Sequence, residues 1–421
     1  MVSSSSNHHY VGNLEYVLGD VKQAQITNRY TSTSIINNAL DGFEEMGVNG
    51  IRIAIFADGV NPNKTMYDYF YNQARARGFK IFANLAQGGG GARVAAGILN
   101  GTAGSVKNTA SSNALVARIK VFAQEYKYDW INPFNEDGRP GSVWFSGQFN
   151  NIYSALDGEL NGAELVGSCD WGIEAGLLSL QNTRIKDYIS ITTTHNLGFT
   201  HSLWPAYINE AGNLPVWDSE ATDTKKFADR DTRLEAAIKA GVNGVVLYNN
   251  WNTINRNTGV LNTTGHTLKD KTTQYYFIEN KKSGKRIKSF RNNENNSLMV
   301  QVPASFTGTF SQWELVPTDN GYFRFKNRET GDYFRPDNSD NFANIEARTS
   351  FSGSGTRVQW KTVNAGSGYS FIENRSTGKN IRSRNDSDIS SSNNNEQSIN
   401  INQAPNGWTG DRTQWKLIPA N

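Results

Sequence analysis

The chain has little cysteine, little histidine and no long apolar segment. Only Cys169 among its 421 residues is a cysteine, so no intrachain disulfide can form, and we expect a buried, inert thiol. The five histidines show no metal-ligand spacing, and His8 and His9 lie in an N-terminal segment that we expect to be mobile. No apolar run approaches the ~20 residues of a membrane helix. We therefore expect no metal, no cofactor and no membrane association.

The first ten residues, MVSSSSNHHY, have neither the basic nor the apolar region of a secretory signal peptide. They look like a mature N-terminus with an added Met, so we expect a secreted protein whose signal has been removed. A chain of 421 residues with 37% hydrophobic and 19% charged residues is typical of a folded protein with two domains.

From about residue 20 to residue 262, short apolar segments alternate with amphipathic helical segments, as in a parallel sheet with crossover helices. The expected strands are Gln23–Thr27, Ile51–Phe56, Lys80–Asn84, Trp130–Phe134, Ala163–Gly167, Ile189–Thr193, Pro215–Asp218 and Val245–Tyr248. The clearest expected helices are Thr33–Met46, Thr65–Arg77, Asn113–Tyr126 and Arg233–Ala240. Eight such units predict an α/β fold, a (β/α)8 TIM barrel over residues 21–268 after an extension at 1–20. A doubly wound open sheet is the competing fold.

Past Leu268 the pattern changes to short β-like segments and a repeat appears. The motif N-[KR]-x-[ST]-G begins at Asn280, Asn327 and Asn374, so the interval is 47 residues both times. A Gln-Trp pair follows in each copy, ending at Trp313, Trp360 and Trp415, and the third copy holds an insertion in DSDISSSNNNEQ. These copies predict a separate all-β domain over residues 269–421.

Three β-rich copies that each end in Gln-Trp resemble the ricin-type β-trefoil, a lectin fold used as a carbohydrate-binding module. The resemblance covers residues 273–421. One copy cannot bury its own Trp, so the three must pack around a common axis. We therefore expect Trp313, Trp360 and Trp415 in the core, with sugar contacts from polar loop residues.

Two glutamates follow predicted strands of the barrel. Glu136 stands after the fourth strand in INPFNEDGRPGS, and Glu220 follows the seventh in LPVWDSEAT. A Glu past a strand is often only a solvated loop residue, but this pair resembles the clan of retaining (β/α)8 glycosidases that includes cellulases, mannanases and β-agarases. The resemblance implies that Glu136 is the acid/base and Glu220 the nucleophile, with carboxyl groups about 5–5.5 Å apart.

Other barrel positions resemble the same clan, residue by residue. The resemblance implies that Arg52, in GVNGIRIAI, hydrogen-bonds the nucleophile and that Asn135 holds the sugar 2-hydroxyl. It places His195, in TTTHN, near the nucleophile and makes Trp251, after LYNN, an aromatic floor under the reacting sugar. The remaining candidate substrate contacts at predicted strand ends are Asn84, Trp171 and Trp217.

Two local alternatives stay open. Asp218 shares strand parity with Glu220 and would replace it as nucleophile if the strand boundary shifted by two residues. The segment NLAQGGGGARVAAG contains four glycines, Gly88–Gly91, without the Gly-Lys-Ser/Thr of a phosphate-binding loop. It predicts either a loop whose backbone approaches a sugar or a flexible turn.

The charge differs between the two halves. Residues 273–421 hold 19 Lys+Arg and 14 Asp+Glu, a net charge of +5, against −2 for residues 1–272. The excess is either a solvated surface or an attraction to an anionic polysaccharide. No basic helix or aromatic platform motif accompanies it, so we expect no nucleic-acid partner.

These patterns predict a secreted, monomeric endo-glycosidase that acts on a polysaccharide substrate. Endo action follows from a cleft of several subsites, built from aromatic side chains expected to be exposed: Trp144, Trp171, Trp204 and Trp217. Marine algal galactans of the agarose, porphyran or carrageenan type are the first expectation, and β-1,3-xylan, β-glucan, chitosan and sulphated fucan remain open. The alternative from another class is a lectin with a degenerate barrel, although such barrels usually lose one catalytic glutamate.

Overall fold

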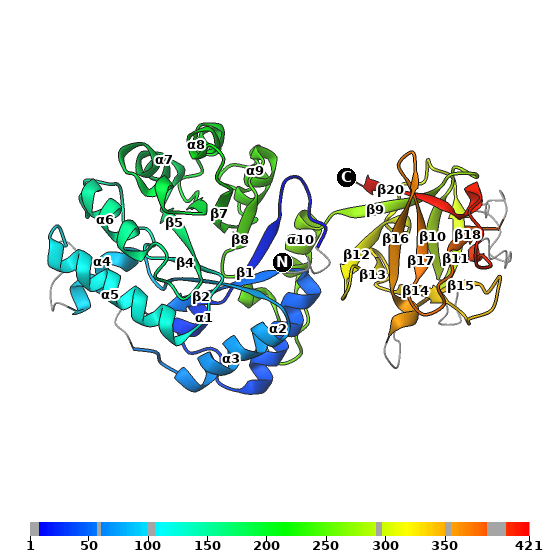
Figure 1. The fold of residues 1–421 in the computed structure, drawn as a ribbon, viewed down its shortest axis with the longest axis horizontal. Coiled ribbons are helices and arrows are strands. Elements are labelled where there is room, and N and C mark those ends of the chain that lie inside the picture. Colours follow the sequence, from blue (N-terminus) through cyan, green and yellow to red (C-terminus); the bar gives the residue numbers. More distant parts are fainter. Residues whose placement is uncertain are drawn as a thin grey trace. The chain divides into compact units, whose positions relative to one another are not determined.

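The computed structural model describes residues 8–56, 60–98, 106–291, 297–349, 355–384 and 401–420. The chain forms two compact units (Figure 1). Among the described residues, one unit spans 10–272, and the other combines those from 273 onward with His8 and His9. Helix α10, Thr263–Thr272, belongs to the first unit and buries Leu268, so the structure divides the chain after the expected boundary at residue 268.

The first unit is a closed barrel of parallel strands in sequential order (Figure 1). Its strands are β1 Tyr16–Asp20, β2 Gly50–Ile55, β3 Lys80–Leu85, β4 Trp130–Asn132, β5 Glu164–Asp170, β6 Ile191–Thr194, β7 Val216–Ala221 and β8 Gly244–Leu247. Its helices are α1 Lys22–Ile26, α2 Thr33–Met46, α3 Lys64–Ala76, α4 Gly90–Ile98, α5 Thr109–Glu125, α6 Ser146–Leu156, α7 Ile173–Asn182, α8 Trp204–Ala211, α9 Arg233–Ala240 and α10. The predicted (β/α)8 barrel is confirmed, and none of the helices in the described segments is long and apolar enough to cross a membrane.

The expected first strand is wrong. Residues 22–26 form the short helix α1, and the first strand is β1, inside the expected N-terminal extension. The Asp20 carboxylate accepts the Lys22 backbone N–H at 3.2 Å, a local bond of the kind that favours a turn into a helix. Gly19 lets the strand pass Phe43, because a Cβ at that position would lie 2.6 Å from the ring. The barrel therefore begins at β1.

Capping residues explain why two helices begin and end where the sequence predicts. The Ser32 hydroxyl accepts the Ile35 N–H at the start of α2, and Gly47 ends that helix in the left-handed conformation at φ 79°. Thr232 and Glu235 form a capping box at the start of α9, and Gly241 ends it at φ 90°.

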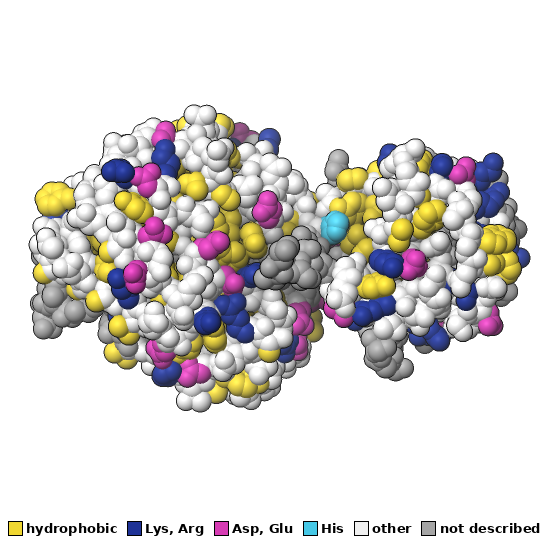
Figure 2. Space-filling view, in the orientation of Figure 1, with side chains coloured by type: hydrophobic (Ala, Val, Ile, Leu, Met, Phe, Trp, Pro, Cys, Tyr) yellow, Lys and Arg dark blue, Asp and Glu magenta, His cyan; other side chains and the backbone are white. Residues whose placement is uncertain are grey.

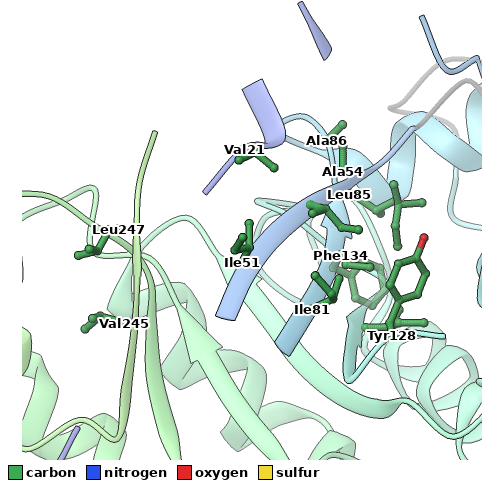
Figure 3. Packing of buried hydrophobic residues seen from close by; sticks show 14 of the residues in the cluster. Val21, Ile51, Ala54, Ile81, Leu85, Ala86, Tyr128, Phe134, Val245 and Leu247 are labelled. Atoms are coloured by element: carbon green, nitrogen blue, oxygen red, sulfur yellow. The ribbon is translucent and has the colours of Figure 1, made fainter. Parts of the chain in front are cut away.

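The barrel has two apolar layers. Side chains that point outward from the strands, such as Ile51, Ile81 and Val245, pack with the helices in the larger cluster (Figure 3). The inner layer fills the barrel with a smaller cluster: Leu18, Phe82, Trp130, Val166, Cys169, Ile191, Trp217 and Val246. Cys169 is a free, buried thiol in this layer. A filled interior leaves chemistry to the ends of the strands.

The second unit is built from antiparallel strands. They are β9 Tyr275–Asn280, β10 Arg286–Arg291, β11 Ser297–Val302, β12 Trp313–Pro317, β13 Phe323–Asn327, β14 Tyr333–Pro336, β15 Ile345–Arg348, β16 Trp360–Gly366, β17 Tyr369–Asn374, β18 Ile381–Ser383, β19 Ile401–Gln403 and β20 Gln414–Ala420. Figure 2 shows basic side chains beside hydrophobic ones on the visible face of this unit. The insertion in the third repeat lies outside the described residues.

The repeated residues make equivalent contacts, as a threefold fold requires. Trp313, Trp360 and Trp415 are buried, and their indole N–H groups donate to the backbone carbonyls of Ile287, Phe334 and Ile381 at 3.1, 3.1 and 3.0 Å. The motif asparagines also act alike, since each side-chain oxygen accepts the backbone N–H groups two and three residues later. The tryptophans are core residues, as the sequence predicts.

Candidate active site

Two glutamates and a histidine meet where the barrel strands end. Glu136 follows β4, His195 follows β6 and Glu220 lies in β7. One carboxylate oxygen from each glutamate and one ring nitrogen of His195 lie within 4.8 Å of one another. The structure thus brings Glu136 together with His195 and Glu220, which lie 59 and 84 positions later in the sequence.

Glu220 is almost fully buried and lies beside positive charge. Arg52 of β2 donates from Nη2 to Glu220 Oε1 at 3.0 Å and from Nη1 to the Ser219 carbonyl at 3.1 Å. Burial alone raises the pKa of the Glu220 carboxyl, but the neighbouring His195 N–H and the positive charges of Arg52 and the buried Lys22 outweigh it, so the pKa lies at about 2. Glu220 is therefore ionised at any pH at which the protein would work.

Arg52 is itself held in place by Asp20, the last residue of β1. Its Nη2 and Nε donate to the Asp20 carboxylate at 2.8 and 3.1 Å, and both side chains are fully buried. Asp20 also accepts the Asn249 backbone N–H at 2.9 Å. The bidentate contact fixes the plane of the guanidinium group and so aims it at Glu220.

Glu136 has the opposite electrostatic surroundings. It is half-buried, and burial together with the negative charge of Glu220 raises the pKa of its carboxyl above the ordinary value. The two carboxyl groups are thus pushed apart in pKa, with Glu220 ionised and Glu136 able to keep a proton. Pairs of this kind divide acid and base roles between two carboxylates.

His195 connects the two glutamates and is fully buried. Its Nε2 lies 3.4 Å from Glu220 Oε1, 3.6 Å from Glu136 Oε1 and 3.2 Å from Asn135 Oδ1. Its Nδ1 lies 2.8 Å from the Ser219 hydroxyl. Burial lowers the pKa of the imidazole to about 3, so the ring is neutral. Because Nε2 faces acceptor oxygens, we infer that Nε2 carries the proton and that Nδ1 accepts from Ser219.

Asp137 and the glycine-rich segment fix the backbone around Glu136. The buried Asp137 carboxylate accepts the backbone N–H groups of Gly91, Ala92 and Asn135 at 3.0, 2.7 and 2.9 Å, and the indole N–H of Trp144 at 3.1 Å. Glu136 lies between two of these anchors with φ 55°, in the left-handed region. These bonds join the start of α4 to the end of β4.

Two of the four glycines, Gly88 and Gly91, allow close packing against this loop. A Cβ on Gly88 would lie 2.7 Å from Glu136 Oε2, and one on Gly91 would lie 2.7 Å from the Phe134 ring. From the sequence, this glycine segment was predicted to be either a sugar-binding loop or a flexible turn. In the structure the glycines let the chain approach Glu136 and Phe134.

We expect Gly88→Ala to lower kcat by roughly 10- to 100-fold, since a shift of about 1 Å in a reacting group has that order of effect. The thermal unfolding temperature should hardly change, because the atom that the new Cβ would meet, Glu136 Oε2, lies at the end of a flexible side chain. Gly147→Ala is the matched control, since a Cβ there meets nothing within 4 Å. Equal kcat in the two variants would show that Gly88 does not set the Glu136 position.

Asn84 and Asn135, expected to touch substrate, make contacts within the protein. Asn84 accepts from Lys22 Nζ at 3.1 Å and donates to the Phe134 carbonyl at 2.9 Å. Asn135 donates to the Gln87 carbonyl at 3.0 Å. Lys22 and Asp20 were missed from the sequence because the first strand was placed after them. Their signal was a short apolar segment that ends in Asp20, with Lys22 two positions later.

Asp218, the alternative nucleophile, lies outside the carboxylate and histidine cluster. The β7–β8 register shifts between Asp218 and Ala221, so the strand parity that made Asp218 and Glu220 equivalent does not hold. Asp218 accepts the Glu220 backbone N–H at 3.0 Å, and burial raises its carboxyl pKa to about 7. Glu220, whose carboxyl pKa is about 2, is therefore better suited than Asp218 to act as an ionised nucleophile.

The expected row of exposed tryptophans is wrong. Trp144, Trp204 and Trp217 are fully buried, and Trp217 packs against the rings of Tyr16, Phe82 and Trp130 inside the barrel. Trp217 is therefore a core residue and not a substrate contact. Trp171, directly after β5, is 51% exposed.

Trp251 lies shortly after β8. It lines a cavity of about 200 Å³ with Arg29, Tyr30, Ile35, Ala39, Asn252, Ile254 and Arg256. These residues belong to the segment between α1 and α2, to α2 itself and to the segment after β8. That Trp251 forms the aromatic floor under a reacting sugar remains an expectation.

The cluster could in principle offer a cation one ligand atom each from Glu136, His195 and Glu220. Arg52 already donates to the Glu220 oxygen, and Lys22 adds a second buried positive charge to the same site. Two cationic side chains repel a divalent ion. The surroundings suit acid–base and nucleophilic chemistry better than metal binding.

Comparison with known proteins gives a family for part of the chain. The model described as ricin-type β-trefoil lectin domain-like matches at residues 260–347 and 311–402. The C-terminal unit is a ricin-type β-trefoil. The matched residues include Trp313 and Trp360, two of the three core tryptophans, and a lectin-like domain supports a carbohydrate ligand. A search of curated proteins finds no match.

Three solved structures illustrate the similarity. A designed threefold symmetric protein, ThreeFoil, is 28% identical with a TM-score of 0.29, over 34% of this chain and 97% of that chain. An exo-β-1,3-galactanase from Clostridium thermocellum is 24% identical with a TM-score of 0.30, over 39% and 33%. A GlcNAcα1-4Gal-releasing endo-β-galactosidase from Clostridium perfringens is 22% identical with a TM-score of 0.27, over 36% and 34%. The chain thus spans about a third of these two enzymes.

Proposed function

We propose that the barrel is a retaining glycoside hydrolase with Glu220 as nucleophile and Glu136 as acid/base. The observation that carries the proposal is the carboxylate pair, whose oxygens lie within 4.8 Å and whose pKa values are displaced in opposite directions. Retaining enzymes hold their two carboxyl groups about 5–5.5 Å apart, whereas inverting enzymes need roughly 6.5–9.5 Å to admit a water molecule. The separation favours retention.

The residues would perform two displacements. Glu136 gives its proton to the glycosidic oxygen while the Glu220 carboxylate attacks the anomeric carbon, so the bond to the leaving sugar breaks and a glycosyl ester forms. Glu136, now ionised, then takes a proton from water, whose oxygen attacks the anomeric carbon and releases Glu220. Arg52 and the neutral His195 hold Glu220 in place, and Asp137 positions Glu136.

We further propose that the substrate is an extracellular polysaccharide, with an algal galactan as the first class to test. The carbohydrate-binding trefoil supports a polymeric ligand, since a linked module raises the local concentration of substrate at the barrel. The net charge of +5 over residues 273–421 favours a chain that carries acidic groups, such as porphyran or carrageenan. Secretion and endo action belong to this proposal.

The test is release of reducing ends from a panel of agarose, porphyran, carrageenan, β-1,3-xylan, β-glucan, chitosan and sulphated fucan. We expect release from at least one polymer and none with Glu220→Gln. A protein that binds a polymer of the panel without releasing reducing ends from it would be a lectin.

The pKa displacements predict the pH dependence. Activity needs Glu220 ionised and Glu136 protonated, so kcat/KM should fall as pH rises through the raised pKa of Glu136, with a midpoint above its ordinary value of 4.5. The acid limb should lie far lower, because the pKa of Glu220 is about 2. Replacing Glu220 by Gln removes a negative charge, so the pKa of Glu136, followed by carbon-13 NMR, should fall. An unchanged Glu136 pKa in that variant would contradict the coupling.

A further inference from the structure

Three basic residues occupy equivalent positions in the trefoil. Lys288 in β10, Arg335 in β14 and Arg382 in β18 are each 47 residues apart. Each directly follows the residue whose backbone carbonyl accepts the indole N–H of its repeat tryptophan. The threefold fold therefore places one cation at the same point of every repeat.

The surroundings of the three cations differ. Arg335 donates from Nε to the Glu346 carboxylate at 3.1 Å, a carboxylate that Arg348 also contacts at 3.0 Å, so Arg335 is paired with an acidic group. Lys288 lies over the rings of Phe306 and Phe310, with Nζ 4.7 and 5.8 Å from the centroids. Arg382 lies over both Phe342 and Trp408, at 4.9 and 5.2 Å from the centroids, and donates to the neutral Asn402 at 3.0 Å. Arg382 thus combines a cation with two aromatic rings.

Arg382 also borders a cavity. The cavity measures about 370 Å³ and is lined by Lys282, Arg382, Trp408, Gly410, Asp411, Arg412 and Thr413. Three of these residues are basic and one is acidic, and the acidic one, Asp411, pairs with Lys281 at 3.0 Å. Trp408 is 46% exposed. Among the described lining residues, basic side chains therefore outnumber acidic ones, and Trp408 forms an accessible aromatic wall.

We propose that this cavity binds an anionic saccharide unit, whose sulfate ester or carboxylate is held by Arg382 and Arg412 and whose ring packs on Trp408. Guanidinium groups bind planar or tetrahedral oxyanions with two parallel hydrogen bonds. The apolar face of a pyranose ring covers an exposed indole and removes apolar surface from water. The size of the cavity suits a small ligand unit.

Mutual repulsion of the basic residues supports this assignment. Burial and the charges of Arg384 and Arg412 lower the pKa of Arg382. An anion placed among these residues relieves the repulsion that they impose on one another. A neutral sugar would contact Trp408 but leave the repulsion unchanged, so the site distinguishes acidic from neutral chains. The site lies in the trefoil, and its binding can be measured whether or not the barrel hydrolyses glycosidic bonds.

The test is isothermal titration calorimetry of the full chain carrying Glu220→Gln, which prevents hydrolysis, with three polymers: a sulfated galactan, a polyuronate and neutral agarose. We expect Arg382→Gln to weaken binding to the sulfated chain, the polyuronate or both by about tenfold or more, because a charge-assisted bidentate contact is lost. Binding to agarose should not change. The two acidic polymers show whether the group recognised is a sulfate ester or a carboxylate.

Arg335→Gln is the matched control, since Arg335 occupies the equivalent position of the second repeat but is paired with Glu346. It should change affinity for the acidic chains less than about twofold. Arg382→Lys keeps the charge and should retain part of the affinity, which separates recognition from misfolding. Equal losses in Arg382→Gln and Arg335→Gln, an equal loss on agarose, or full displacement of the acidic chain by single-stranded DNA at equal charge would overturn the proposal.

Discussion

Replacing Glu220 by Gln should lower kcat by roughly 10⁴-fold or more, because a neutral amide cannot form the glycosyl ester and no second group replaces the nucleophile. The Gln side chain lacks the negative charge of Glu220, but its oxygen can still accept the hydrogen bond from Arg52, which is 3.0 Å long in the wild type. Initial rates of reducing-end release on the preferred polymer measure the effect, with circular dichroism to confirm folding.

Asp218→Asn is the matched control in the same strand. Asp218 is buried like Glu220, and its replacement keeps an oxygen that can accept the Glu220 backbone N–H. We expect activity within about tenfold of the wild type, since only the support of the neighbouring backbone changes. Loss of activity in Asp218→Asn together with activity in Glu220→Gln would reassign the nucleophile to Asp218.

Replacing Glu136 by Gln should have an effect that depends on the leaving group. On the polymer, kcat should fall by about 10²–10⁴-fold, the usual contribution of a general acid. On an aryl glycoside with a strongly acidic phenol, glycosylation needs no proton, so the loss in kcat/KM should be much smaller. Azide should raise the turnover of this substrate, because an anionic nucleophile does not need Glu136 as a base.

Steady-state rates on both substrates, with and without azide, distinguish this role from others. An equal loss on the polymer and the aryl glycoside, with no effect of azide, would mean that Glu136 acts on the fold or on substrate binding and not by proton transfer.

The barrel could be predicted because its alternation of strands and helices extends over the whole unit, but its first strand could not. The segment Tyr16–Asp20 contains Gly19 and Asp20, which are more typical of turns than of strands. Only the packing of Gly19 on Phe43 and the pairing of β1 with β2 and β8 show why it is a strand. Because the first strand was misplaced, Asp20 and Lys22 were not predicted as residues of the site.

Strand periodicity indicates neither how far along the barrel an inward residue lies nor where a register shift changes the face that a residue occupies. Trp217 and Glu220 belong to the same strand, yet Trp217 fills the interior and Glu220 reaches the catalytic cluster. A period of two residues separates the two faces of a strand, but it carries no information about height along the barrel axis. The register shift near Glu220 is a backbone irregularity that the period also cannot reveal.

The stereochemistry of the first product tests the catalytic pair most directly. Proton NMR of the newly formed reducing end, recorded before mutarotation equilibrates the anomers, shows which configuration is released. Carboxylate oxygens within 4.8 Å predict that the first product keeps the anomeric configuration of the bond that was cleaved. A first product of the opposite configuration would contradict double displacement by Glu136 and Glu220.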